Sequence, residues 1–85
     1  MKTVLHIIQD KLGIHARPAG QIVKLASQYS SDIKFTTASK TVDARRIMAL
    51  MGLGVHQGDQ LKVTFEGTDE AAAAAAFSAY LKESL

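Results

Sequence analysis

Cysteine is absent from the 85 residues, which excludes a disulfide scaffold and a thiolate zinc site. The three histidines, His6, His15 and His56, are too scattered along the sequence to predict a metal cluster. No apolar run approaches the roughly 20 residues that a membrane-spanning helix needs. We therefore expect no metal, no cofactor and no direct insertion into a membrane.

Charge of one sign does not accumulate either. The chain has 10 Lys and Arg residues against 8 Asp and Glu residues, a formal net charge of +2, and only 6% aromatic residues. Nucleic-acid binding usually needs a basic stripe with stacking aromatic side chains, so we expect no nucleic-acid partner. The opening segment turns polar at Asp10 and Lys11, where a signal peptide would need more apolar residues and a small-residue cleavage site. This pattern favours a cytoplasmic protein.

The remaining composition, 47% hydrophobic and 21% charged, is typical of one small globular domain over residues 1–85. Apolar and alternating segments predict strands at residues 2–9, 32–37, 41–43 and 60–66. The first strand has apolar side chains on both faces, which indicates an inner strand of the sheet. The last strand alternates strictly, so we expect the sheet to pack on helices with one face only.

Three helices are predicted between and after these strands. The first begins at Pro18 and runs to about residue 28. The second, around residues 47–51, ends at the glycines that follow it. The last has Thr68 as its N-cap and continues through six alanines. The order β-α-β-β-α-β-α predicts a two-layer α+β sandwich with the helices on one face of a mostly antiparallel sheet.

Chemistry concentrates in residues 13–19, GIHARPA, where a histidine and an arginine stand at the start of a helix. Imidazole has an unperturbed pKa of about 6.5, so much of it is neutral near pH 7 and its free ring nitrogen can attack phosphorus. Arg17 can bind phosphate oxygens through two N–H groups at once, and the amides of a helix start favour an anion. Pro18 shapes the turn so that neighbouring amides can point at the phosphate.

These residues fit a covalent phosphohistidine on His15, passed on to another molecule, better than they fit hydrolysis. A different interpretation stands beside this one. A single histidine before a helix is more often a cap or a surface residue, and an arginine two residues later is usually solvated.

The segment GIHARPA resembles the active-centre motif of HPr, the histidine-containing phosphocarrier family of the bacterial phosphoenolpyruvate:sugar phosphotransferase system. The resemblance covers nearly the whole chain. VDARRIMALMGLGV is similar to the family's segment around the second helix, and GDQLKV with EGTDEA is similar to its last strand and the start of its last helix. The resemblance implies an open-faced β-sandwich, with a four-stranded antiparallel sheet and three helices on one face.

By this resemblance, His15 matches the phosphorylated histidine, which takes its phosphoryl group from Enzyme I and gives it to the IIA domains of sugar permeases. In the family the group is carried on the ring nitrogen Nδ1. Arg17 matches the residue that stabilises the phosphoryl group, and Pro18 matches the residue that shapes the helix start. The resemblance thus implies a carrier protein and not an enzyme with a reaction of its own.

Three residues of the second helix match the family's apolar docking patch for Enzyme I and IIA. These residues, which we call the docking patch, are Ile47, Met48 and Met51. Methionine suits such a surface because its flexible thioether adapts to several partners. The alternative is that Ile47, Leu50 and Met51 simply fill the core, so we expect a mixture of core and surface residues on this helix, with Met48 the most exposed.

Two departures from the family pattern stand out. Arg46 occupies the position where many family members have a regulatory serine, and a guanidinium cannot accept that phosphate. We expect the pair Arg45 and Arg46 to lie on an exposed face and to favour acidic docking surfaces. Leu12 stands where polar residues are common in the family, which puts in doubt a local hydrogen bond beside the active loop.

The other two histidines are predicted to have no chemical role. His6 shares a strand face with apolar residues and is predicted to be a partly buried structural residue, whereas His56 lies in a glycine-rich loop and is predicted to be solvated. The leading hypothesis is a monomeric phosphocarrier that binds its partners transiently. The alternatives are a regulatory HPr paralogue read by a non-transport partner, an inert module that docks through Met48, and, least favoured, a free-standing enzyme.

Overall fold

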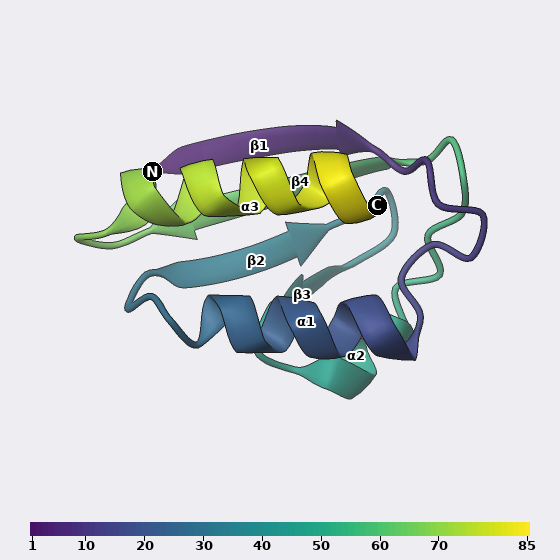
Figure 1. Ribbon diagram of the computed structural model, residues 1–85, viewed down its shortest axis with the longest axis horizontal. Coiled ribbons are helices and arrows are strands. Elements are labelled where there is room, and N and C mark those ends of the chain that lie inside the picture. Colours follow the sequence, from purple (N-terminus) through teal and green to yellow (C-terminus); the bar gives the residue numbers. More distant parts are fainter.

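Four strands form one antiparallel sheet in the order β1-β4-β2-β3, and three helices cover it (Figure 1). The computed structural model describes all residues from 1 to 85. The strands are β1 (Lys2–Ile7), β2 (Asp32–Thr36), β3 (Thr41–Asp43) and β4 (Gln60–Glu66), and the helices are α1 (Ala16–Ala26), α2 (Ile47–Met51) and α3 (Glu70–Ser84). This element order and the antiparallel sheet confirm the predicted α+β fold.

The core lies between the sheet and the helices because the inner strands alternate as predicted. Along β4, Leu61, Val63 and Phe65 are buried, while the residues between them face outward. Phe77 of α3 packs edge-on against Phe35 of β2 and Phe65 of β4, with ring centroids 6.1 and 5.4 Å apart. Edge-to-face packing is a favourable arrangement for aromatic rings, and it helps to hold α3 against β1 and β4, the two strands that this helix covers.

The prediction that the first strand lies inside the sheet is wrong. β1 is an edge strand that pairs only with β4. Leu5 and Ile7, the apolar residues that suggested a second buried face, are 61% and 50% exposed on the open face of the sheet. His6 is partly buried, as predicted, and its Nε2 is buried with no hydrogen-bond partner in the protein.

The starts of α1 and α3 differ by one or two residues from the predicted starts. α1 begins at Ala16, so Pro18 is its third residue. The first amides of a helix have no intrahelical acceptor, so a proline at this position costs no hydrogen bond. α3 begins at Glu70 with Asp69 as its N-cap, so the prediction of Thr68 is wrong. Asp69 nevertheless leaves its own helix uncapped, because its carboxylate is engaged elsewhere.

The Asp69 carboxylate ties the start of α3 to the segment before β2. It accepts hydrogen bonds from the Ser30 and Ser31 amides at 2.8 and 3.0 Å, and a further one from the Ser31 hydroxyl. These bonds, the Ser31 hydroxyl foremost, lower the pKa of Asp69 because they favour the charged carboxylate. A contact between residues so distant in sequence has no local signal.

Arg45 corrects a third prediction, because it is not a free surface cation. Its Nη2 lies 3.0 Å from the carbonyl oxygen of Ala26, 2.6 Å from that of Tyr29 and 3.1 Å from that of Ser31. The guanidinium therefore satisfies carbonyls at the end of α1 and in the segment that follows it. Only Arg46 is exposed, and it alone offers positive charge at the start of α2.

We expect Arg45→Met to lower the free energy of unfolding by about 2 kcal/mol, because three partly buried carbonyl oxygens would lose a charged donor. Urea unfolding followed by circular dichroism measures the change. Arg46→Met is the matched control, since the same substitution at the exposed neighbour removes no such contact. Equal midpoints for the two variants would show that the Arg45 contacts do not stabilise the fold.

Candidate functional site

The loop that leads from β1 to α1 is held by its own backbone and by the segment after α2. Gly13 has a φ of +64°, and a Cβ atom at this position would lie 2.2 Å from the carbonyl oxygen of Val55. The Asp10 side chain accepts the Leu12 amide at 2.8 Å, and the Asp10 carbonyl accepts the Gly13 amide at 3.1 Å. These contacts fix the backbone of the loop at Gly13, two residues before His15.

His15 is the N-cap residue of α1, and its ring is free of any capping role. Its backbone is extended, with φ −108° and ψ −170°, and its carbonyl accepts the Ala19 amide at 2.9 Å. The imidazole makes no capping hydrogen bond and is half-buried. The amides of Ala16 and Arg17, in the first turn, donate to no acceptor in the protein. An anion bound to the ring would meet these free donors and the positive end of the helix dipole.

Beside the ring lies a hollow of about 290 Å³, which we call the acceptor hollow. Its lining residues are Asp10, His15, Arg17, Pro18, Gln21 and Ser84. Arg17 is exposed and forms no salt bridge, so its guanidinium is available to an anion, whereas Pro18 is buried. The structure thus brings the three residues predicted for phosphoryl chemistry to one place.

Three other members of the acceptor hollow escaped the sequence analysis. Gln21 lies one helical turn after Arg17, so helical spacing could have placed it on the same face. Asp10 was noted only for its charge in the opening segment. Ser84 comes from the last turn of α3, and no sequence signal connects it with the active loop.

The docking patch is a row of exposed side chains on α2. Met48 is 74% exposed, while Ile47 and Met51 are 42% and 40% exposed. Leu50, on the opposite side of the helix, is fully buried. The expected mixture of core and surface residues is therefore found, with Met48 the most exposed. The δ-methyl of Ile47 lies 3.9 Å from the position of a Cβ on Gly20, which places α2 against α1.

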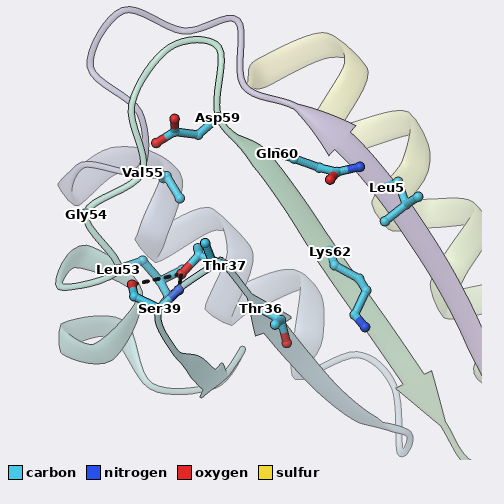
Figure 2. Close-up of a pocket in the computed structure, with 11 residues that line it drawn as sticks. Leu5, Thr36, Thr37, Ser39, Leu53, Gly54, Val55, Asp59, Gln60 and Lys62 are labelled. Carbon is cyan, nitrogen blue, oxygen red and sulfur yellow. Dashed lines mark hydrogen bonds between the residues drawn. The ribbon is translucent and has the colours of Figure 1, made fainter.

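A second, larger hollow of about 440 Å³ lies on the open face of the sheet (Figure 2). Leu5, Gln60 and Lys62 contribute to it from β1 and β4, and Thr37 and Ser39 from the turn between β2 and β3. It shares no lining residue with the acceptor hollow and contains no histidine. The acceptor hollow is therefore the candidate site.

The remaining histidines do not join this site. His56 is exposed, with Nδ1 3.6 Å from an Asp59 carboxylate oxygen, and His6 is partly buried on the edge strand β1. No group of three or more potential metal ligands lies together in the structure.

A family model described as "PTS HPr component phosphorylation site" matches residues 3–83 of the chain. The chain belongs to the HPr family. HPr proteins are phosphocarriers of the phosphotransferase system and are not independent enzymes, so the prediction of a phosphocarrier is confirmed at the level of the family.

Known proteins support this assignment over nearly the whole chain. The phosphocarrier protein HPr of Lysinibacillus sphaericus is 41% identical over 83 residues, which are 98% of this chain and 94% of that protein. A crystal structure of HPr from Thermoanaerobacter tengcongensis matches with a TM-score of 0.90 and 42% identity over 98% of this chain and 93% of that one. Crh of Bacillus subtilis, a catabolite repression protein, matches with a TM-score of 0.78 and 35% identity over 92% and 90%. None of the helices combines the length and apolar character that crossing a membrane needs.

Proposed function

We propose that His15 of this HPr-family chain accepts a phosphoryl group from Enzyme I and passes it to the IIA domains of sugar permeases. The observation that carries the proposal is the free imidazole of His15 at a helix N-terminus, in the same hollow as the unpaired guanidinium of Arg17. Residues 1–85 act in this proposal as one cytoplasmic carrier domain. Because residue 46 is an arginine, the domain lacks the regulatory serine that many family members have at this position.

In the transfer step, the lone pair of a ring nitrogen of neutral His15, Nδ1 by family resemblance, attacks the phosphorus of the donor. A nitrogen–phosphorus bond forms to His15, and the bond from phosphorus to the donor breaks with its electron pair going to the donor. Arg17 and the free amides of the first turn balance the charge on the phosphoryl oxygens. Pro18 holds the backbone of that turn. The same step in the opposite direction gives the group to the acceptor.

Enzyme I and the IIA domain approach the same docking patch in turn, so each complex must be short-lived. A small apolar interface around Met48 suits such exchange, because fast dissociation requires a modest buried area. A monomer presents this surface to both partners. Dimers occur among the relatives, including an HPr dimer of Thermoanaerobacter tengcongensis and a swapped dimer of Crh.

A regulatory role read by a non-transport partner is the second candidate function. The observation in its favour is the 35% identity to Crh, which is named for catabolite repression. Transfer assays with a panel of IIA domains separate the two roles. A carrier passes its phosphoryl group to at least one IIA domain at a rate comparable to its own phosphorylation, whereas a regulatory protein passes it to none.

The direct test incubates the protein with phosphoenolpyruvate and Enzyme I and measures its mass before and after mild acid treatment. We expect a gain of one phosphoryl group that acid removes, because a phosphoramidate is acid-labile. An acid-stable adduct would point to a hydroxyl acceptor. A protein that gains no mass would instead be an inert docking module.

Arg17→Ala should slow phosphoryl transfer about 10- to 100-fold, because the variant loses the one cation in the acceptor hollow. Rapid-quench measurement of the phosphorylated fraction gives the rate constant. Lys24→Ala is the matched control, since it removes an exposed cation near the other end of the same helix. Unchanged rates in Arg17→Ala would exclude the proposed role of the guanidinium.

Met48→Asp should raise the KM of Enzyme I for this protein about tenfold, because a charge at the centre of an apolar interface has no partner there. The maximal rate should change less, since His15 and Arg17 are untouched. Steady-state kinetics at increasing protein concentration separates the two effects. Leu5→Asp places the same charge on the exposed sheet face and should leave KM as it is. A normal KM for Met48→Asp would exclude the docking patch.

A further inference from the structure

The C-terminal helix supplies a side wall of the acceptor hollow that the transfer step above does not use. Tyr80 and Ser84 lie one turn apart on α3, and Ser84 lines the hollow directly. The Tyr80 hydroxyl lies 2.8 Å from Oε1 of Gln21 and 3.4 Å from the carbonyl oxygen of Pro18. Hydroxyl donors typically bond to oxygen at about 2.5–3.0 Å, so the Tyr80 proton goes to Gln21.

Tyr80 remains a hydrogen-bond donor throughout the neutral pH range. Burial raises the pKa of its hydroxyl, and a hydrogen bond with the Ser84 side chain offsets only part of that rise. The phenol is therefore protonated wherever the carrier works. Its contact with the carboxamide of Gln21 does not switch off with pH in that range.

This contact fixes which end of the Gln21 carboxamide faces the hollow. Because Oε1 accepts the Tyr80 proton, the NH₂ group is the end left for the hollow that Gln21 lines. Nε2 donates to no acceptor in the protein. Gln21 also lies one helical turn from Arg17, so the two donors share a face of α1. If the carboxamide turned over, its oxygen would face the phosphoryl oxygens and repel them.

We propose that Gln21 binds the phosphoryl group carried by His15 through its Nε2–H, and that Tyr80 is a positioning residue that holds the amide in this orientation. The inference rests on the proposed function, which makes His15 the acceptor. Arg17 supplies charge and Gln21 supplies a directed neutral donor. The phosphorylated state is thereby stabilised from both the first and the second turn of α1, with α3 as the support.

The equilibrium of phosphorylation is the property that tests this role. Purified protein is mixed with a catalytic amount of Enzyme I and with phosphoenolpyruvate and pyruvate at a series of fixed ratios. Mass spectrometry of the intact protein gives the phosphorylated fraction at each ratio, and hence an equilibrium constant that docking affinity does not affect. Urea unfolding of each unphosphorylated variant reports stability separately.

We expect Gln21→Leu to lower this equilibrium constant roughly five- to tenfold, the size of a typical net hydrogen bond, because Gln21 is exposed and water competes for the phosphoryl oxygens. Gln21→Glu, which keeps the shape but adds negative charge, should lower it further. Tyr80→Phe should lower it about two- to threefold in the native background and have almost no effect when Gln21 is already Leu. Gln28→Leu, the same change at an exposed position beyond the other end of α1, is the matched control and should have no effect.

The outcomes separate this inference from the function on which it rests. A native protein that is never phosphorylated overturns both. A native protein that is phosphorylated, with an unchanged equilibrium constant in Gln21→Leu and Gln21→Glu, overturns only the role of Gln21. Lower stability of Tyr80→Phe with an unchanged constant makes that contact purely structural and overturns the positioning role. Coupled losses at Gln21 and Tyr80 support the proposal.

Discussion

His15→Ala gains no acid-labile phosphoryl group from Enzyme I and phosphoenolpyruvate, yet folds like the native chain. This is the largest expected effect on function, because the variant lacks the only nucleophilic ring in the acceptor hollow. Stability should change little, since the imidazole caps no amide of α1 and the extended backbone at this position suits alanine. Intact-protein mass and urea unfolding measure the two properties on the same sample.

The remaining histidines provide the controls for this result. His56→Ala removes an exposed ring near Asp59 and should be phosphorylated at the native rate. His6→Leu removes a ring whose Nε2 is buried without a partner, so it should be phosphorylated normally and be no less stable. An acid-labile adduct on His15→Ala would mean that another residue is the acceptor, and the assignment of the acceptor hollow would be wrong.

The parts of the fold that could be predicted are those that local periodicity encodes. β4 alternates apolar and polar residues because one of its faces meets helices and the other does not, and such a pattern has no second interpretation. The second helix was predicted around residues 47–51 because a glycine follows it, and α2 has these bounds. β2 and β3 were predicted as two separate strands because a short break at residues 38–40 divides two segments with strand character.

The parts that could not be predicted depend on contacts between distant residues. β1 has apolar residues on both faces, a pattern that is typical of an inner strand. The structure leaves Leu5 and Ile7 exposed at the sheet edge instead. The sequence predicts Arg45 to be a surface charge, because its three carbonyl acceptors lie 14 to 19 residues earlier in the chain and leave no local signal. Asp69 similarly finds its partners in the segment before β2.

The candidate site divides along the same line. His15, Arg17 and Pro18 are neighbours in one heptapeptide, so their chemistry and spacing could be interpreted together. The wall from α3 was missed, because Tyr80 reaches Gln21 only through tertiary packing across 59 residues. The contact between Gly13, in the loop from β1 to α1, and the backbone of Val55 was missed for the same reason. Sequence thus indicates the reacting groups, and the structure adds the residues that hold them.

Because the loop between β1 and α1 packs against Val55, we expect Gly13→Ala to destabilise the fold strongly, although it adds only one methyl group. The added Cβ would lie 2.2 Å from the Val55 carbonyl oxygen, and the φ of +64° strains any residue with a side chain. Because the opposing atom is backbone, the loop itself has to move. We expect a loss of about 3 kcal/mol in the free energy of unfolding from the clash and the strain together.

Gly54→Ala separates the two causes. Gly54 has a similar φ of +72° but no atom within 4 Å of its added Cβ, so this variant should lose only about 1 kcal/mol, the strain alone. Phosphoryl-transfer rates, measured at a temperature where both variants are folded, then show whether the contact between Gly13 and Val55 affects transfer. Gly13→Ala should transfer at least about tenfold more slowly than Gly54→Ala, because it displaces the loop that delivers His15 to the first-turn amides. Equal stabilities and equal rates in the two variants would mean that the loop relaxes away from Val55 freely, and that the position of His15 does not depend on this contact.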